Sequence, residues 1–299
     1  PTSIQYIKKK MSGQKLSNEE INCIIKDAVD RTLGEIEITA FITAEQHHGM
    51  NMDEIQALTR AMVDHGSIID FQRPVFDKHS LGGIPGNKVT LLIVPIVAAA
   101  GLLIPKTSSR AITSPSGTAD TMSVLAPVDF TASELKAIAM KTNGAIIWGG
   151  SLNLAPADDI FIGVEYPLQI DPEPQMLASI MAKKLAVGTN YLVLDLPVGR
   201  EAKVETFEQA RSISNQLIDL GERLGVRVKC GITYGGQPVG YSVGPALEAK
   251  EALLALEGRG PTSLVEKSTA LAGLLFELAG KASKGKGQDM AKELLASGK

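Results

Sequence analysis

The sequence has 299 residues, of which 44% are hydrophobic, and its 30 Lys and Arg residues against 33 Asp and Glu residues give a net charge of −3. A surface that neutralises phosphates normally shows as an excess of basic residues, so we expect no nucleic-acid partner. The length and hydrophobic content exclude a disordered chain and suffice for one large domain or two lobes.

The first 70 residues have a helical pattern. Ser17 begins a capping box ahead of apolar residues at helical spacing, and Gly34 is placed to end that helix. A second helix is predicted over Glu35–His48, and a third opens at Asn51 and stops at Gly66.

After residue 72 the pattern changes to short apolar segments that alternate with helices. A short strand is predicted at Val75–Phe76, a buried helix at Lys88–Gly101 and another extended segment from Leu103. A helix from about Thr118 to Leu125 follows, and Thr131 caps the next one. This alternation is typical of an α/β fold.

A helical pattern returns with a segment predicted to run over residues 171–188. Asp171 is its expected N-cap, because a proline at the first helical position and an acidic first turn follow it. Strands are then predicted at Tyr191–Leu196 and Val226–Ile232, and further helices open at Thr206 and Ser263.

The two patterns each occur twice, which predicts two lobes. An all-helical lobe would combine residues 1–72 and 155–187. An α/β lobe with a mostly parallel sheet would combine residues 73–154 and 188–299.

Location and metal content are also constrained. The longest apolar run, over residues 89–104, contains a proline and a glycine and is shorter than the roughly 20 residues of a membrane helix, so no membrane partner is expected. Cys23 and Cys230 have no metal-ligand spacing, which predicts neither a disulfide framework nor a metal site. With no secretory signal in the first ten residues, the expected location is the cytoplasm.

A polar, glycine-rich segment, Asp77–Thr90, lies between a predicted strand and a predicted helix. Backbone amides freed by glycines, a helix N-terminus and nearby Lys and Ser donors are what an anion requires. The segment is not a Walker A loop, because Asn87 and Val89 stand where that motif needs Gly and Ser or Thr. The alternative is a plain glycine-rich connection with a surface Lys-His pair.

A second polar segment, Thr107–Thr118, is rich in hydroxyl groups and also precedes a helix. These groups suit phosphate or ribose oxygens, and Arg110 is expected to be a buried cation among them. An ordinary capping loop is the alternative. Two such loops after neighbouring strands favour a ligand site, because open α/β sheets bind ligands beyond the carboxyl ends of their strands.

Together these motifs resemble the nucleoside phosphorylase family that contains the thymidine and pyrimidine-nucleoside phosphorylases. The resemblance rests on Asp77-Lys78-His79-Ser80-x-Gly82-Gly83, Ser109-Arg110, Gly117-Thr118-x-Asp120, Ser179-x-x-x-Lys183-Lys184 and Asp195-x-x-Val198-Gly199. Within the family, the segments 83–88 and 109–114 are most similar to the AMP phosphorylases. The resemblance implies a pentosyltransferase that converts AMP, and other nucleoside 5′-monophosphates, and phosphate to free base and ribose 1,5-bisphosphate. It implies no cofactor besides the co-substrate phosphate.

The resemblance also implies site residues. Phosphate would be bound by Lys78, His79, Ser80 and Ser108. Nucleotide contacts would come from Gly83, Ser109, Arg110, Ala111, Ile112, Thr113, Ser114, Thr118, Ser179, Lys183 and Lys203. Asp171 would be the proton donor, with the helix cap as its alternative role, and for Lys203 the alternative is a solvated lysine in a charged loop.

Alternatives remain open at this stage. Pyrimidine-specific members carry an Arg where Val164 stands and a His where Ser114 stands, yet a pyrimidine-nucleoside phosphorylase is the main rival. A phosphoribosyltransferase of related fold and a nucleotide-binding fragment without turnover are the others. Because the family extends beyond both ends of this chain, the chain resembles a central fragment, and the resemblance implies a homodimer formed through the helical lobe.

Overall fold

The computed structural model describes residues 2–111 and 114–299 and divides into two compact units. Unit 1 comprises Pro1–Ile69, Asn153–Gly188 and Asp219–Leu224, and unit 2 comprises Asp70–Leu152, Thr189–Ile218 and Gly225–Lys299. The sequence pattern assigns 219–224 to the α/β lobe instead. These residues join unit 1 because Arg223 forms an ion pair with Asp53 at 2.7 Å and its carbonyl oxygen accepts a hydrogen bond from Arg60.

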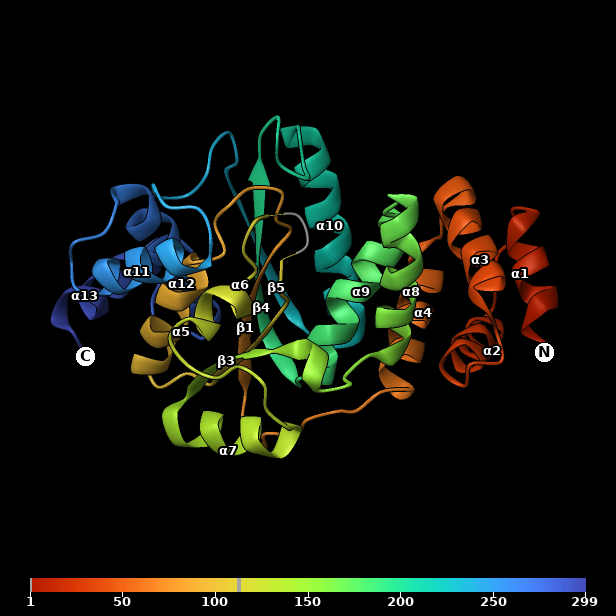
Figure 1. Cartoon of the computed structure of the whole chain (residues 1–299), viewed down its shortest axis with the longest axis horizontal. Helices are drawn as coiled ribbons and strands as arrows, with labels where there is room; N and C mark the ends of the chain where they lie inside the picture. Colours follow the sequence, from red (N-terminus) through yellow and green to blue (C-terminus); the bar gives the residue numbers. More distant parts are fainter. Residues whose placement is uncertain (1, 112–113) are drawn as a thin grey trace. The chain divides into compact units, whose positions relative to one another are not determined.

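Unit 1 is helical. Its helices are α1 (Ser3–Met11), α2 (Asn18–Val29), α3 (Glu35–His48), α4 (Met52–Asp64), α8 (Pro156–Leu168) and α9 (Glu173–Ala186) (Figure 1). The capping boxes predicted at Ser17 and Asn51 are confirmed, since each side chain accepts the amide three residues on. Helix α2 ends at Val29 rather than Gly34, because Gly34 is extended and donates its amide to Glu37 in the first turn of α3.

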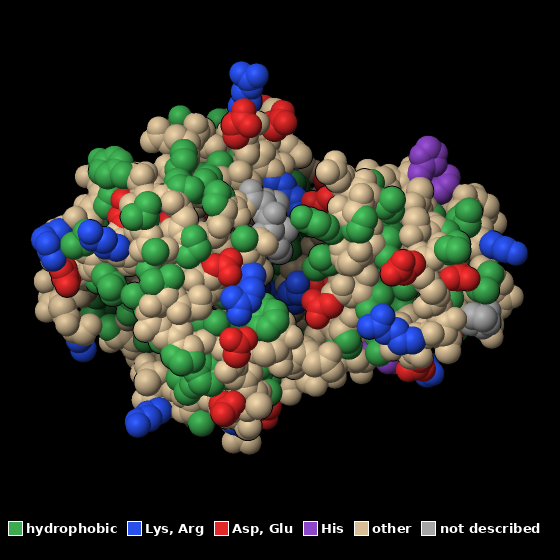
Figure 2. Space-filling view, viewed as in Figure 1, with side chains coloured by type: hydrophobic (Ala, Val, Ile, Leu, Met, Phe, Trp, Pro, Cys, Tyr) green, Lys and Arg blue, Asp and Glu red, His purple; other side chains and the backbone are tan. Residues whose placement is uncertain are grey.

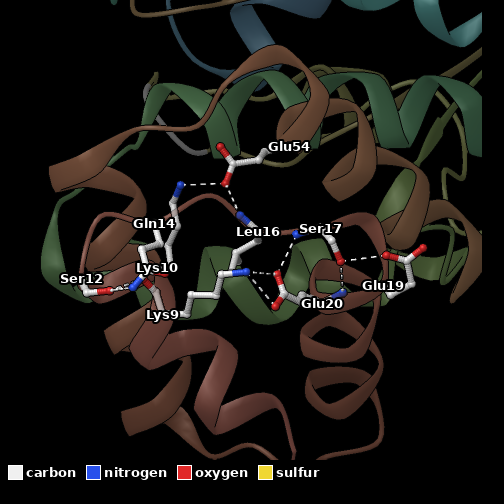
Figure 3. A network of polar contacts seen from close by, with 9 residues as sticks. All are labelled: Lys9, Lys10, Ser12, Gln14, Leu16, Ser17, Glu19, Glu20 and Glu54. Atoms are coloured by element: carbon white, nitrogen blue, oxygen red, sulfur yellow. Dashed lines mark hydrogen bonds and ion pairs between the residues drawn. The ribbon is translucent and has the colours of Figure 1, made fainter.

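Ion pairs join the amino-terminal helix to its neighbours (Figure 3). Lys9 contacts Glu20 at 2.8 Å, and Lys10 contacts Glu54 at 2.9 Å. The second pair is fully enclosed, with both side chains 3% exposed, and Glu54 also accepts the amide of Leu16 at 3.0 Å. Glu54 therefore neutralises a buried ammonium and ties the α1–α2 connection to α4.

Unit 1 also buries the carboxyl group of Glu45 on α3. Within the described residues, neither of its oxygens has a hydrogen-bond partner. Burial, reinforced by the nearby carboxyl group of Glu165, raises the pKa of Glu45 well above its ordinary value of 4.5, although Lys10 opposes the shift. The folded chain therefore keeps a proton on Glu45 that the unfolded chain releases as the pH rises.

We expect Glu45→Gln to raise the free energy of unfolding at pH 8 and to leave it nearly unchanged at pH 4. Above the unfolded-state pKa of 4.5, each pH unit over which only the unfolded chain has lost this proton destabilises the native protein by up to about 1.4 kcal/mol. Glutamine has no such proton. Urea unfolding at both pH values measures the effect, with the exposed Glu35→Gln on the same helix as control. An equal gain at both pH values would show that ionisation of Glu45 is not the cause.

Unit 2 is built on parallel strands (Figure 1). Strands β1 (Val75–Ser80), β4 (Thr189–Val198) and β5 (Arg227–Tyr234) form one sheet in the order β1-β4-β5, and β2 (Ile104–Ser108) pairs with β3 (Gly144–Trp148) in another. A bridge between Val75 and Leu103 links the two sheets at the amino end of β1. In parallel strands all carboxyl ends lie at the same edge, so the polar segments that follow β1 and β2 leave the sheets on one side.

The remaining helices lie in unit 2, apart from residues 219–224 of α10. They are α5 (Val89–Ala99), α6 (Thr118–Ser123), α7 (Ala132–Thr142), α10 (Phe207–Leu224), α11 (Pro245–Leu256), α12 (Thr262–Leu278) and α13 (Gly287–Ser297), with a short 3-10 turn at Gly149–Ser151. Helices α5 and α12 pack on one another and α12 lies against β4 and β5, so that α5, α11, α12 and α13 gather beside the sheet (Figure 1). The predicted fold class, helical and α/β parts with a parallel sheet, is confirmed.

Several predicted elements differ in extent or in their caps. Strand β1 runs on to Ser80 instead of ending at Phe76, because it pairs with β4 along its whole length. Helix α9 has Pro172 as its N-cap, so Asp171 lies one residue outside it. Helix α12 is capped at Pro261, and the hydroxyl of Ser263 instead accepts the amide of Gly240 at 3.1 Å. Strand β3 and helices α1, α8, α11 and α13 were not predicted as separate elements.

Charge on the surface is mixed in sign. On the face shown in Figure 2, Lys and Arg side chains are interspersed with Asp and Glu rather than gathered in one basic patch. Within residues 2–111 and 114–299, none of the helices has both the length and the apolar content needed to cross a bilayer.

Candidate functional site

The carboxyl edge of the larger sheet in unit 2 holds the first group of candidate residues. Lys78, His79 and Ser80 are the last three residues of β1. Lys78 is almost fully buried, whereas His79 and Ser80 are half-buried. In the parallel pairing of β1 with β4, Ser80 stands opposite Asp195. The residues assigned to phosphate on β1 therefore lie beside a buried carboxylate.

Asp195 is the centre of a polar cluster. Its oxygens accept hydrogen bonds from the hydroxyl groups of Ser80 at 2.8 Å and Thr233 at 2.6 Å, and the Lys267 ammonium lies 3.0 Å away. Burial alone would raise the pKa of Asp195, but the positive charges of Lys267 and Lys78 hold it below its ordinary range. Asp195 is therefore an anion at neutral pH that orients Ser80 and balances the charge of two lysines.

The glycine-rich segment after β1 makes a close backbone contact with another predicted site residue. Gly83 has a φ of +95°, and a Cβ at this position would lie 2.2 Å from the amide nitrogen of Lys203. Only glycine fits there, because a side chain would require both a strained backbone and a shift of the 202–203 segment. The structure thus brings together Gly83 and Lys203, whose side chain is exposed.

Asn87 joins the two polar segments that the sequence singled out. Its amide nitrogen donates to the hydroxyl oxygen of Ser114 at 3.1 Å and to the carbonyl oxygen of Ser116 at 2.7 Å. The hydroxyl of Ser114 in turn donates to the carbonyl of Ser116 at 2.8 Å. Asn87 therefore fixes the glycine-rich segment to the hydroxyl-rich one.

Asp120, on α6, organises the second polar segment. Its carboxylate accepts the amides of Ala111 at 2.6 Å and Gly117 at 3.0 Å, and the carbonyl of Ser109 accepts the amide of Ala119. Thr118 is buried as the first residue of α6. The predicted contacts Ile112 and Thr113 lie outside the described residues.

Ser108 closes the end of β2 with its side chain half-buried. Its hydroxyl donates to the carbonyl of Ile147 on β3 at 2.8 Å. Since the hydroxyl of Ser80 likewise donates to Asp195, both predicted phosphate-binding hydroxyls direct their protons at protein acceptors. Each must rotate to donate to a bound phosphate.

The expectation that Arg110 is a buried cation is wrong. Its side chain is 44% exposed, with Asp120 at 3.3 Å and Asp129 at 3.6 Å, and its guanidinium lies 4.8 Å from the ring centre of Trp148. Two carboxylates and an aromatic face at the surface satisfy the charge without burial.

A second group of candidates lies in unit 1, on α8 and α9. Ser179 and Lys183 are one turn apart on α9, and the Lys183 ammonium lies 2.7 Å from the fully buried carboxylate of Asp158. Burial alone would lower the pKa of Lys183, but the Asp158 carboxylate outweighs it and raises this pKa. Lys183 is therefore a cation that Asp158 holds in place, and part of its side chain is exposed.

Asp171 is exposed in the connection between α8 and α9. Since Pro172 occupies the cap position, the structure does not give Asp171 the N-cap role that was its alternative.

Sequence reasoning missed some members of the Asp195 cluster. Asp195 was noticed only as part of a motif, and neither Thr233 on β5 nor Lys267 on α12 carried a local signal, because their partners are distant in sequence. Thr233 and Lys267 also line a cavity of about 380 Å³ with Tyr234, Gln237 and Ser263. Among the described residues, no group of three or more His, Cys, Asp or Glu side chains is placed to hold a metal ion.

The fold defines the class of protein, a helical bundle combined with a parallel α/β unit. Anthranilate phosphoribosyltransferase from Thermus thermophilus has this fold, with a TM-score of 0.79 and 21% identity over 98% of this chain and 94% of that one. The same enzyme from Saccharomyces cerevisiae, solved with PRPP and Mg, gives a TM-score of 0.76 and 17% identity over 99% and 94%.

The chain belongs to the glycosyl transferase family. The family's helical bundle domain matches residues 4–66, and its a/b domain matches residues 72–299.

Several curated relatives are named AMP phosphorylases. The chain is 58% identical to that of Thermococcus kodakarensis, 57% to that of Pyrococcus furiosus and 56% to that of Methanocaldococcus jannaschii. Each match covers 100% of this chain and 60% of the relative. The chain therefore spans about 60% of the length of these curated relatives.

Proposed function

We propose that this chain is the part of an AMP phosphorylase that holds AMP and phosphate and transfers the ribose 5-phosphate group from base to phosphate. The observation that carries the proposal is the joined pair of polar segments in unit 2. Buried Lys78, half-buried Ser80, the close contact of Gly83 with Lys203 and the Asn87 bridge all occur in a chain 58% identical to an AMP phosphorylase.

In the proposed reaction, one oxygen of inorganic phosphate attacks C1′ of the ribose as the bond from C1′ to the base nitrogen breaks. Lys78, Ser80 and Ser108 hold the phosphate by one ammonium and two hydroxyl groups. The negative charge on Asp195 keeps Ser80 and Lys78 in place before phosphate arrives. No covalent intermediate with the protein is needed, because positioning and charge stabilisation suffice.

The departing base leaves with the electron pair of the broken bond and must gain a proton. We assign this proton to Asp171, which would change from the carboxylic acid to the carboxylate in the step. Ser179 is proposed to contact the nucleotide, as is Lys183, whose ammonium Asp158 holds. The products are free adenine and ribose 1,5-bisphosphate, so every atom of AMP and phosphate is accounted for.

The decisive experiment incubates the 299-residue chain with AMP, CMP, UMP or thymidine, with and without phosphate, and measures free base. Phosphate-dependent release of adenine from AMP supports the proposal. Release of thymine from thymidine alone favours a pyrimidine-nucleoside phosphorylase, whereas binding of AMP without base release favours a nucleotide-binding fragment. Magnesium and pyrophosphate dependence would indicate a phosphoribosyltransferase.

Lys203→Ala separates a nucleotide phosphorylase from a nucleoside phosphorylase. If the Lys203 ammonium meets the 5′-phosphate, its charge-assisted contact is worth roughly 1.5–3 kcal/mol, so the KM for AMP should rise about ten- to a hundredfold. Adenosine lacks this phosphate and should respond little. Steady-state kinetics with both substrates measure the difference, and Arg200→Ala, in the same exposed loop, is the control. Equal losses for AMP and adenosine would reject the assignment of Lys203.

The proposal includes a homodimer in the cytoplasm and no cofactor besides phosphate as co-substrate. These parts rest on the resemblance to the nucleoside phosphorylases. Light scattering of the purified chain measures its oligomeric state, and a monomer would contradict the homodimer.

A further inference from the structure

Lys88 lies near the end of the glycine-rich segment, and its ammonium pairs with Glu251 instead of facing an open anion site. It is the N-cap residue of α5, and its side chain is fully buried. Its ammonium lies 2.5 Å from a carboxylate oxygen of Glu251 on α11 and donates to the carbonyl oxygen of Ser242 at 2.5 Å. A buried ammonium needs such partners, so the charge of Lys88 serves the protein's own structure.

The same carboxylate holds a second loop, residues 239–244. Glu251 accepts the amide of Tyr241 at 2.9 Å and the hydroxyl of Ser242 at 3.3 Å. Gly240, with a φ of +72°, approaches so closely that a Cβ there would lie 2.3 Å from Glu251 and 3.1 Å from the Lys88 nitrogen. The loop is therefore wrapped around the Lys88–Glu251 pair.

Contacts between the two loops continue along the glycine-rich segment. The carbonyl of Pro85 accepts the amide of Val239 at 2.9 Å, and a Cβ on Gly86 would lie 3.0 Å from the Val239 side chain. Asn87 binds the hydroxyl-rich segment on the other side. Residues 85–88 are thus fixed on two sides, and Lys88 supplies the charge that fixes the last of them.

Charge balance around this pair depends on Lys88. Glu248, one turn before Glu251 on α11, is also buried, and burial raises its pKa, whereas the neighbouring Lys88 counteracts the effect of burial on Glu251 and keeps the pKa of that carboxyl low. Without Lys88, two buried acidic groups would remain beside the loop without this cation. The carbonyl oxygen of Ser242 would then lose the hydrogen bond that Lys88 donates to it.

We propose that Lys88 is a positioning residue: its ammonium acts as an internal counter-ion that ties the glycine-rich segment to the 239–244 loop and so sets the conformation of residues 80–88 for anion binding. The part of this inference that concerns phosphate rests on the proposed function. The tether itself does not, because it is a property of the two loops.

The test is Lys88→Met in the 299-residue chain, which keeps an unbranched side chain one atom shorter than lysine and removes the ammonium group. We expect the dissociation constant for inorganic phosphate, from calorimetry, and the apparent phosphate KM in AMP phosphorolysis to rise about ten- to a hundredfold, since small misplacements of binding groups have effects of this size. Amides of residues 82–91 should exchange hydrogen faster than in the parent chain.

A matched control is available in unit 1. Lys10→Met breaks the Lys10–Glu54 pair, which is as deeply buried (Figure 3), and makes the same chemical change. We expect it to lower the melting temperature as Lys88→Met does, yet to leave phosphate affinity within about twofold, because a buried pair contributes to global stability wherever it lies. Equal loss of phosphate affinity in the two variants would overturn the positioning role.

Glu251→Gln provides an independent variant should Lys88→Met fail to fold. It leaves Lys88 with the Ser242 carbonyl and should weaken phosphate binding in the same direction, and a Lys88→Met/Glu251→Gln double variant should be no worse than the poorer single variant, because the pair acts as a unit. Additive losses, or unchanged exchange of amides 82–91, would overturn the tether. If the parent chain neither binds phosphate nor releases base, the proposed function fails while the exchange data still decide the tether.

Discussion

Replacing Asp171 with Asn is expected to lower the rate of AMP phosphorolysis by about a hundredfold or more, the usual scale for loss of a general acid. The melting temperature should hardly change, because Asp171 is exposed and Pro172, not Asp171, caps α9. The amide keeps the shape of the side chain and removes only the transferable proton. Steady-state rates with saturating AMP and phosphate, together with thermal unfolding, make the measurement.

The matched control for Asp171 is Glu173→Gln. It removes the same charge two residues later, in the first turn of α9, and should leave the rate within about twofold since surface substitutions away from a site have small effects. A fully active Asp171→Asn would remove Asp171 from the mechanism. A parallel loss in both variants would point to the charge of this connection rather than to a proton donor.

Asp195→Asn should lower the free energy of unfolding by about 3–5 kcal/mol, the cost of removing one partner from a buried ion pair. The change leaves Lys267 and Lys78 without the carboxylate that balances them and disturbs the acceptors of Ser80 and Thr233. Urea unfolding measures the loss. Asp289→Asn, which breaks an exposed ion pair with Lys286 in the same unit, should stay within about 0.5 kcal/mol.

The pH dependence of the Asp195→Asn effect follows from the lowered pKa of Asp195. Stability from a carboxylate with a lowered folded-state pKa is complete above its unfolded value, here 3.8, and is lost as the pH falls through the folded value. The difference between the variant and the parent should therefore be full at pH 7 and shrink below pH 4. A difference that is unchanged in acid would show that Asp195 stabilises the fold by packing rather than by charge.

The sequence pattern was sufficient to predict those features of a helix that depend on residues a few positions apart. The capping boxes at Ser17, Asn51 and Thr131 each need only a side chain and an amide three residues away, and all three are present. Helix α3 begins and ends at the predicted residues Glu35 and His48. The alternation of helical and α/β segments likewise gave the two parts of the fold.

The sequence pattern was insufficient where contacts between residues distant in sequence determine the structure. The polar residues Asp77–Ser80 are typical of a loop, yet they form a strand, because β4 supplies backbone partners and buried charges. The sequence gives no sign that the ammonium of Lys88 pairs with Glu251, because the two residues are far apart along the chain. The hydroxyl-rich context of Arg110 predicted burial, whereas Trp148 and two surface carboxylates hold this side chain at the surface.

By itself, the sequence determined the helical and α/β halves, the caps of individual helices and the two polar segments, because periodicity, capping and glycine content act over a few residues. Only the tertiary structure decided which polar groups face one another. Asp195 contacts Ser80, Thr233 and Lys267, which come from separate elements. The nearby lysine charges keep the pKa of its buried carboxyl group low. The pairing of buried charges depends on their distance in the folded structure, which the spacing of residues along the chain does not predict.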